Sequence, residues 1–140
     1  MNLENNNTCC LADVVRVIDV LQRNAETNEL CDDTCTRPFL GNNPTTLCFN
    51  TRPITLYSCN GTRIETPYEI TSGETTIEGT SGVYRVESVN DCCVTCMVLA
   101  NNPITTDPNV PYIRTNTYIT FDLNCVCAIQ CLPDVIVNNI

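Results

Sequence analysis

Twelve cysteines are the side chains of this 140-residue chain whose types and spacing could do chemistry. Thiols bind zinc, exchange disulfides or cross-link chains. Other common reactive groups are missing, since the sequence holds no His and no Lys, which excludes His general bases, Ser-His-Asp triads and Schiff-base lysines. No carboxylate pair stands in a recognisable motif, and no phosphate-binding loop is present. We therefore predict no catalytic site, no metal site and no cofactor.

Zinc is the sharper alternative for the cysteines. Cys93-x2-Cys96 together with Cys127-x3-Cys131 could form a four-thiolate site. On a strand, however, Cys93 and Cys96 would point to opposite faces, because side chains alternate with a period of two. A thioredoxin-like redox pair at the same positions has no βαβ pattern around it. Disulfide bonding is the simpler interpretation.

The adjacent pairs Cys9-Cys10 and Cys92-Cys93 rarely bridge to themselves, so each member needs a different partner. On a strand the two members point to opposite faces, so one can serve the core and the other a neighbour. The full connectivity of twelve cysteines cannot be deduced from sequence.

We expect the links between subunits to lie near the N-terminus. Eight mostly polar residues precede Cys9 and Cys10, and a mobile chain end can bring a thiol to a neighbour. Cys125, Cys127 and Cys131 should be mostly internal, in a strand buried on both sides. The candidates for links between subunits are Cys9, Cys10, Cys31 and Cys35. The other disulfide candidates are Cys48, Cys59, Cys92, Cys93, Cys96, Cys125, Cys127 and Cys131.

Residues 9–26 carry a helical pattern that follows a flexible polar N-terminus, residues 1–8. A cap at Asn7 or Thr8 would start the helix. Its predicted inner face recurs at spacings of three and four, and Asp13, Arg16, Asp19 and Arg23 form a charged face. The predicted inner face comprises Leu11, Val14, Ile18, Leu21 and Ala25. Residues 24–36 are expected to form a loop.

Residues 37–140 carry short strand patterns separated by turn signals, which are typical of a β-sandwich or barrel. Asn60-Gly61 predicts a hairpin between residues 54–58 and 62–66, since both residues tolerate positive φ. Further strands are expected at 83–89, 92–100, 117–123 and 125–132, with a last short one at 134–137. The prediction is a mainly β, sandwich-like single domain with an N-terminal α-helix.

The formal charge of −9 makes nucleic acid a poor partner, because an acidic surface repels phosphates. No apolar run approaches the roughly 20 residues of a membrane-spanning helix. Asn and Thr are abundant while only 16% of residues are charged, which suits dense packing of copies. Disulfides imply an oxidising setting, yet residues 1–8 are not a secretory signal. Three explanations fit: metal is held in the cytosol, a signal was removed, or the surrounding cell later dies and the thiols oxidise.

The segment Asp122-Leu123-Asn124-Cys125-Val126-Cys127-Ala128-Ile129-Gln130-Cys131-Leu132 resembles the C-terminal signature of the CotY/CotZ/ExsY family of spore coat and exosporium proteins. Residues 10–21 resemble the N-terminal helix of that family. Residues 37–41, 50–57, 85–89 and 91–93 match further family segments in the same order. The resemblance covers nearly the whole chain.

The resemblance implies a structural protein, not an enzyme, that self-assembles into a hexagonal two-dimensional lattice of hexameric units, hardened by disulfides. Its place would be the basal layer of the exosporium or the outer coat, with other coat or exosporium proteins as partners. It would be made in the mother cell without a signal peptide, and that cell later lyses. Two alternatives remain, a cysteine-rich zinc-binding protein and a secreted disulfide-rich binding module. Zinc bound in stoichiometric amounts would favour the first, and a monomer under oxidising conditions the second.

Overall fold

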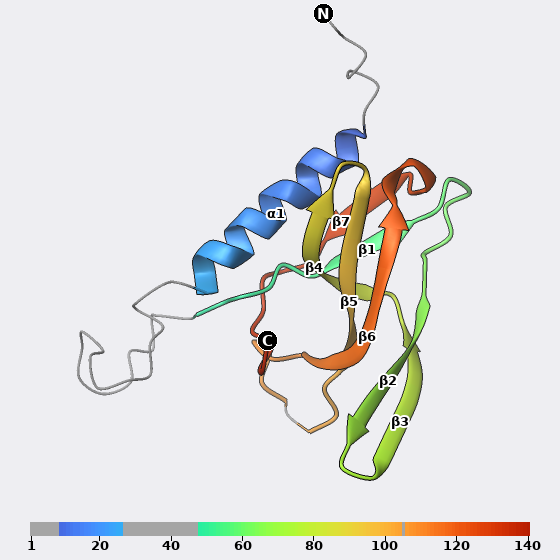
Figure 1. Ribbon diagram of the computed structural model, residues 1–140. Helices are drawn as coiled ribbons and strands as arrows, with labels where there is room; N and C mark the ends of the chain where they lie inside the picture. The colour runs from blue at the N-terminus through green and yellow to red at the C-terminus, as the bar shows by residue number, and fades with distance from the viewer. Residues whose placement is uncertain (1–8, 27–47, 105) are drawn as a thin grey trace, which may run out of the picture.

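A computed structural model describes residues 9–26, 48–104 and 106–140 of the chain, and Figure 1 shows the arrangement of their helices and strands. The elements in chain order are α1 (Cys10–Glu26), β1 (Ile54–Tyr57), β2 (Thr66–Ser72), β3 (Thr75–Ser81), β4 (Val83–Asn90), β5 (Cys93–Asn101), β6 (Tyr112–Asp122), the 3-10 helix η3 (Leu123–Cys125) and β7 (Ala128–Cys131). The predicted flexible N-terminus at residues 1–8 lies outside the described residues, as does most of the predicted loop at 24–36.

Five strands form an antiparallel sheet in the order β6-β5-β4-β1-β7, and β2 and β3 form a separate two-stranded sheet. The second sheet lies beside β6 (Figure 1). Hydrogen bonds join β2 to β6: Glu69 N–H donates to Thr117 Oγ1 at 2.9 Å and Thr71 N–H to Asn116 Oδ1 at 2.7 Å. The predicted class, mainly β with an N-terminal helix and a sandwich-like pair of sheets, is confirmed.

The helix α1 packs against β4 and β5, as the left side of Figure 1 shows. Its buried side consists of Ala12, Val15 and Ile18, each at most 2% exposed, which join the main core beside Tyr84 and Val86. Gln22 holds the other end of the helix, because its side chain donates to Val86 O at 2.8 Å and accepts from Arg52 N–H at 3.0 Å.

The predicted inner face of the helix is wrong in part. Ile18 is buried as expected, but Val14 and Leu21 are 41% and 44% exposed. The packed side is rotated toward Ala12, Val15 and Gln22. Spacings of three and four residues identify an apolar stripe, but they do not show which of two adjacent stripes packs against the sheet. The small side chain of Ala12 lets the helix approach the sheet closely. One apolar stripe is therefore left on the surface.

The Asn60-Gly61 turn is present, but the hairpin that it starts is short. Gly61 has φ +87°, and Ile64 N–H donates back to Leu56 O at 2.8 Å. Beyond this point β1 pairs with β7 and β4 instead of with residues 62–66. The predicted second arm is therefore not a strand of the sheet, because β2 begins only at Thr66.

The strands predicted near 83–89 and 92–100 correspond to β4 and β5, whereas β6 begins five residues earlier than predicted. The last pair of strands differs more. Residues 123–125 form η3 and only Ala128–Cys131 is extended, with an exposed outer side, so the expected strand buried on both sides is wrong. Residues 134–137 contribute only a bridge between Val135 and Thr51.

We expect the buried Tyr84 hydroxyl to stabilise the join between the two sheets. It lies 2.7 Å from Thr66 Oγ1 and donates to Ile64 O, and burial raises the pKa of this phenol, which keeps it neutral. Tyr84→Phe should lower the free energy of unfolding by about 1–2 kcal/mol, because it leaves buried partners without a bond. Urea unfolding of protein with its disulfides intact measures the loss.

The matched control is Tyr118→Phe, because the Tyr118 side chain is half exposed and its hydroxyl accepts a hydrogen bond from Arg114. Its effect should stay below about 0.5 kcal/mol, as for most surface changes. Equal losses in the two variants would contradict the assigned role of Tyr84.

Candidate functional site

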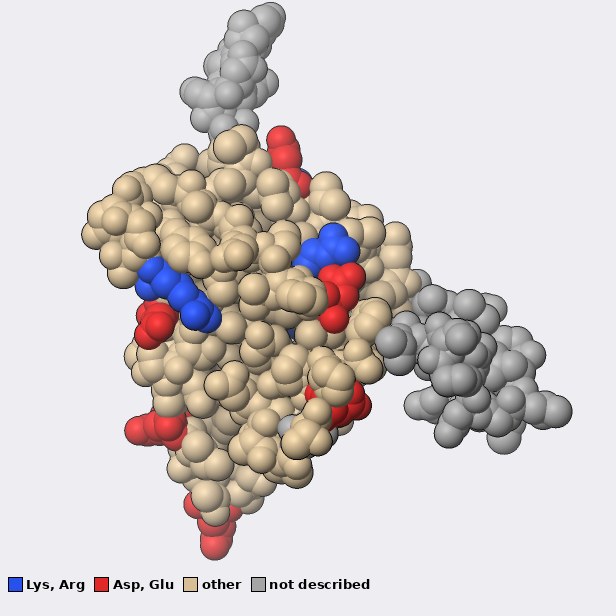
Figure 2. Space-filling model, turned by 180° about the vertical axis from the view of Figure 1, so that it is seen from behind, with Lys and Arg blue, Asp and Glu red and all other residues tan. Residues whose placement is uncertain are grey.

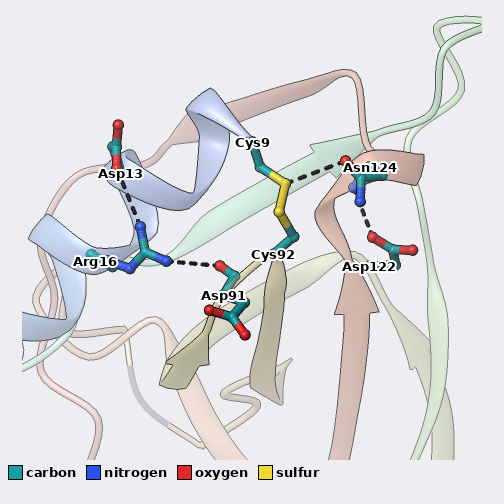
Figure 3. Close-up of a disulfide and its surroundings, with 7 residues drawn as sticks. All are labelled: Cys9, Asp13, Arg16, Asp91, Cys92, Asp122 and Asn124. Carbon is teal, nitrogen blue, oxygen red and sulfur yellow. Dashed lines mark hydrogen bonds and ion pairs between the residues drawn. A yellow bond between two sulfur atoms is a disulfide. The ribbon is translucent and has the colours of Figure 1, made fainter. Parts of the chain in front are cut away.

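Three segments far apart in the sequence meet around one disulfide, shown in Figure 3. Cys9, just before α1, is bonded to Cys92, in the turn between β4 and β5, with their Cα atoms 5.8 Å apart. Cys9 Sγ also lies 3.3 Å from Asn124 Oδ1, so η3 reaches the same place. The disulfide closes a loop of 83 residues, which restricts the unfolded chain strongly.

Polar contacts hold the surroundings of this disulfide in place. Arg16 bridges the helix and the turn, since its guanidinium donates to Asp13 Oδ1 at 3.2 Å and to Asp91 O at 2.9 Å (Figure 3). Asp91 has φ +54°, a left-handed conformation that Asp tolerates better than most residues. Asp122 accepts from Asn124 N–H at 2.9 Å and caps η3.

Three unbonded cysteines surround this network, each adjacent in sequence to one of its members. Cys10 follows Cys9, Cys93 follows Cys92, and Cys125 follows Asn124. All three are exposed and free. We call Cys10, Cys93 and Cys125 the thiol end of the molecule. It presents accessible sulfur on a part of the fold that is held by a disulfide and several hydrogen bonds.

A fourth exposed free thiol, Cys131, lies elsewhere. It ends the edge strand β7 opposite Ile54, close to the Arg52–Asp134 ion pair, whose N–O distance is 2.7 Å. The hydrogen bond and the charge of Asp134 raise the pKa of Arg52. Arg52 N–H also bonds to Gln22, twelve residues along α1 from Cys10, so Cys131 belongs to a different region from the thiol end.

Cys59 and Cys127 form the second disulfide whose two partners are described, with Cα atoms 4.9 Å apart. It ties the turn after β1 to the segment before β7. Cys127 is bonded within the chain, whereas Cys125 and Cys131 are exposed and unbonded, and the expectation that these cysteines are mostly internal remains a prediction. The sequence reasoning assumed one continuous strand, and η3 interrupts it.

Cys9, a predicted candidate for links between subunits, is bonded to Cys92 of the same chain in this structure. Cys10, its neighbour, is free and exposed, which suits the expected role. Cys48 is disulfide-bonded. Cys31 and Cys35 lie outside the described residues, and their role in linking subunits remains a prediction.

Cys96 is the one described free cysteine that is buried, with no exposed surface, between Val86 and Ile119 on its neighbouring strands. Burial raises the pKa of its thiol to about 12. The four-thiolate zinc set is not assembled: Cys96 lies in the core, Cys93 points to the opposite face and Cys127 is bonded to Cys59. Within residues 9–26, 48–104 and 106–140, no group of three or more potential metal ligands comes together.

Two carboxylates come together that the sequence reasoning did not pair. Glu69 on β2 stands directly opposite Glu78 on β3. The signal for this pairing was the Gly73-Glu74 turn, where Gly73 has φ +63°, flanked by Thr-rich and Ile-containing arms. Both glutamates line an open hollow with Pro67, Tyr68, Gly79, Thr80 and Thr117.

Among known proteins, a family model described as spore coat protein Z matches residues 1–134. No curated protein and no solved structure matches the chain. The match spans α1, both sheets and all four exposed free thiols described above.

Exposure predicts which thiols react in the folded protein. Iodoacetamide at mildly alkaline pH should modify Cys10, Cys93, Cys125 and Cys131 and leave Cys96 unmodified, because only an accessible thiolate is an effective nucleophile. Peptide mass spectrometry gives the modified positions. Adding urea before the reagent should expose Cys96, and modification of Cys96 as fast as Cys93 in the folded protein would contradict the structure.

Proposed function

Since the chain belongs to the spore coat protein Z family, we propose that it self-assembles into a disulfide-cross-linked two-dimensional lattice of hexameric units. The lattice would form the basal layer of the exosporium or the outer coat. A structural role in the spore coat and a place at the spore surface come with the family. The lattice, its symmetry, its other coat partners and synthesis in the mother cell are the proposal.

The observation that carries the proposal is the placement of the exposed free thiols in two separate regions. A subunit with one reactive position can form only a dimer, whereas two or more positions let each copy bond to several neighbours. The thiol end lies at the start of α1, and Cys131 lies at the end of an edge strand near the opposite half of the helix. A rise of 1.5 Å per residue puts Gln22 about 18 Å along α1 from Cys10.

The surface suits close packing of copies. Figure 2 shows a face on which charged side chains are few and scattered, with uncharged residues covering most of the area. Each copy nevertheless carries a formal charge of −9, so copies repel one another at long range. Salt screens this repulsion over about 8 Å at physiological ionic strength. Assembly should therefore be favoured by added salt.

The bonds within and between chains would have separate tasks. Cys9–Cys92 and Cys59–Cys127 hold the subunit in shape. Links from the free thiols would join subunits that have already packed, so they would chiefly slow dissociation. No catalytic step is needed, and with neither His nor Lys in the sequence we propose that the protein is not an enzyme. No helix in the described part of the chain is long and apolar enough to cross a bilayer.

Electron microscopy of the purified protein, with and without reductant, tests the assembly. We expect ordered arrays of this chain alone under both conditions, with greater resistance to heat and denaturant after oxidation. A monodisperse monomer at high concentration, reduced and oxidised, would rule out self-assembly.

A variant set separates the links from the lattice. Changing Cys10, Cys93, Cys125 and Cys131 to Ser together should reduce covalent multimers on non-reducing gels several-fold, while arrays still form and dissociate at lower temperature. Cys96→Ala is the control, because it removes a buried thiol that cannot reach a neighbour. Unchanged multimers in the fourfold variant would show that other cysteines link the subunits.

A further inference from the structure

The exposed side of α1 carries an apolar surface that the fold itself does not use. Eight large apolar side chains are exposed among the described residues, and half of them lie on this one helix. They are Val14, Val17, Val20 and Leu21, with exposed fractions of 41%, 57%, 55% and 44%. At helical spacing Cys10, Val14, Val17 and Leu21 fall on one line, next to the buried stripe. Clustered exposed apolar residues mark contact surfaces more often than chance.

Charged residues run along the other flank of this exposed surface. Asp13, Arg16, Asp19 and Arg23 alternate in sign along the helix. Asp13 and Arg23 are the most accessible, with side chains 83% and 64% exposed. Their ion pairs within the helix, Arg16–Asp13 and Arg23–Asp19, are surface pairs of little strength. They leave both groups able to bind a further partner.

The alternation makes this surface complementary to itself in one orientation. In an antiparallel pair about a two-fold axis, the charged flank of one helix meets the charged flank of the other in reverse order. Asp13 then faces Arg23 of the second copy, and Val14 faces Leu21. Both pairs are centred within half a residue of the same point, between Val17 and Ile18. A parallel pair would instead place the charged flank of each helix against the apolar flank of the other.

We propose that α1 packs antiparallel against α1 of a second copy, about a two-fold axis beside Val17. The contact deepens the self-assembly proposed above and rests on it, since it names one surface through which copies meet. Such an interface is isologous, so every contact occurs twice. An anionic lipid surface is a poorer occupant, because the described helix has Asp13 and Asp19 beside its two arginines and no Lys.

The register fixes where Cys10 lies. With the axis between positions 17 and 18 and a rise of 1.5 Å per residue, the two Cys10 residues are about 22 Å apart along the helices. Cys10 instead lies level with position 25 of the second copy, one residue or about 1.5 Å beyond the exposed Asn24. Across this contact Cys10 cannot bond to Cys10, and its neighbour is Asn24.

A cysteine introduced at this position tests the register in the full-length protein. Asn24→Cys should form a disulfide between Cys10 of one copy and the introduced thiol of the other, mapped by mass spectrometry after mild oxidation. The same change combined with Cys10→Ser should lose that link. A link between two Cys10 residues would overturn the antiparallel arrangement.

Charge exchange tests the complementarity. Asp13→Arg and Arg23→Asp should each weaken association, by a few-fold to tenfold in the dissociation constant, because each places like charges opposite each other. The double variant Asp13→Arg/Arg23→Asp should recover most of the loss, since both pairs are restored with their signs reversed. Sedimentation measures association, and a double variant weaker than either single change would contradict the pairing.

Val17→Arg tests the apolar centre, because the axis brings two guanidinium groups together. Association through α1 should be lost, with an unchanged melting temperature of the monomer. If association is unchanged and the melting temperature falls, another segment of the same chain covers the helix and the inference is wrong. Arrays that form unaltered from Val17→Arg would refute this contact and leave the lattice standing. The opposite result is also possible. If the expected cross-link forms and the charge-exchanged double variant recovers association, but no arrays appear, the contact stands and the lattice is refuted.

Discussion

Two cysteines that are adjacent in sequence rarely form a disulfide with each other, and much of this structure follows from that constraint. Neighbouring residues rarely meet disulfide geometry with each other, and their side chains diverge. In both adjacent pairs one sulfur enters the Cys9–Cys92 bond while the other, Cys10 or Cys93, is exposed and free. Tying the helix to the turn between β4 and β5 therefore also places two thiols on the surface. The Cys9–Cys92 disulfide that stabilises the fold and the free thiols that neighbouring subunits could reach therefore result from the same two pairs of adjacent cysteines.

The helix α1 likewise has one side that stabilises the fold and another that is left on the surface. A helix of 17 residues needs only one stripe to dock on a sheet, and here Ala12, Val15 and Ile18 provide it. The second apolar stripe, on the exposed side of the helix, lowers the solubility of the subunit and adds nothing to its core. In a protein of a spore coat family, an exposed apolar stripe would become useful if copies pack together as proposed above.

Sequence reasoning reached the class and the helix, because both depend on local patterns. Residues 10–26 have a clear period, and β4 and β5 alternate around a turn with Asp91 at positive φ. The partners of β1 and the divided region after β6 depend on contacts far apart in the chain, which one-dimensional patterns do not record. The split of each adjacent cysteine pair could be foreseen from geometry, but which member turned inward could not. In the structure Cys9 lies between Cys92, in the β4–β5 turn, and Asn124, three segments that are far apart in the sequence.

A cross-link strengthens a layer only when the bodies that it joins keep their shape. If the start of α1 moved freely, a bond at Cys10 would restrain a short length of chain and little else. The Cys9–Cys92 bond, the bridge from Arg16 to Asp91 O and the docking of Gln22 at the far end hold the whole helix against the sheet. Strain applied at Cys10 would then be carried into β4 and β5, through the core between them and the helix. The disulfides within the subunit would thus allow disulfides between subunits to strengthen the layer. Free thiols beside an internal disulfide are better placed for such links than thiols on a mobile chain end.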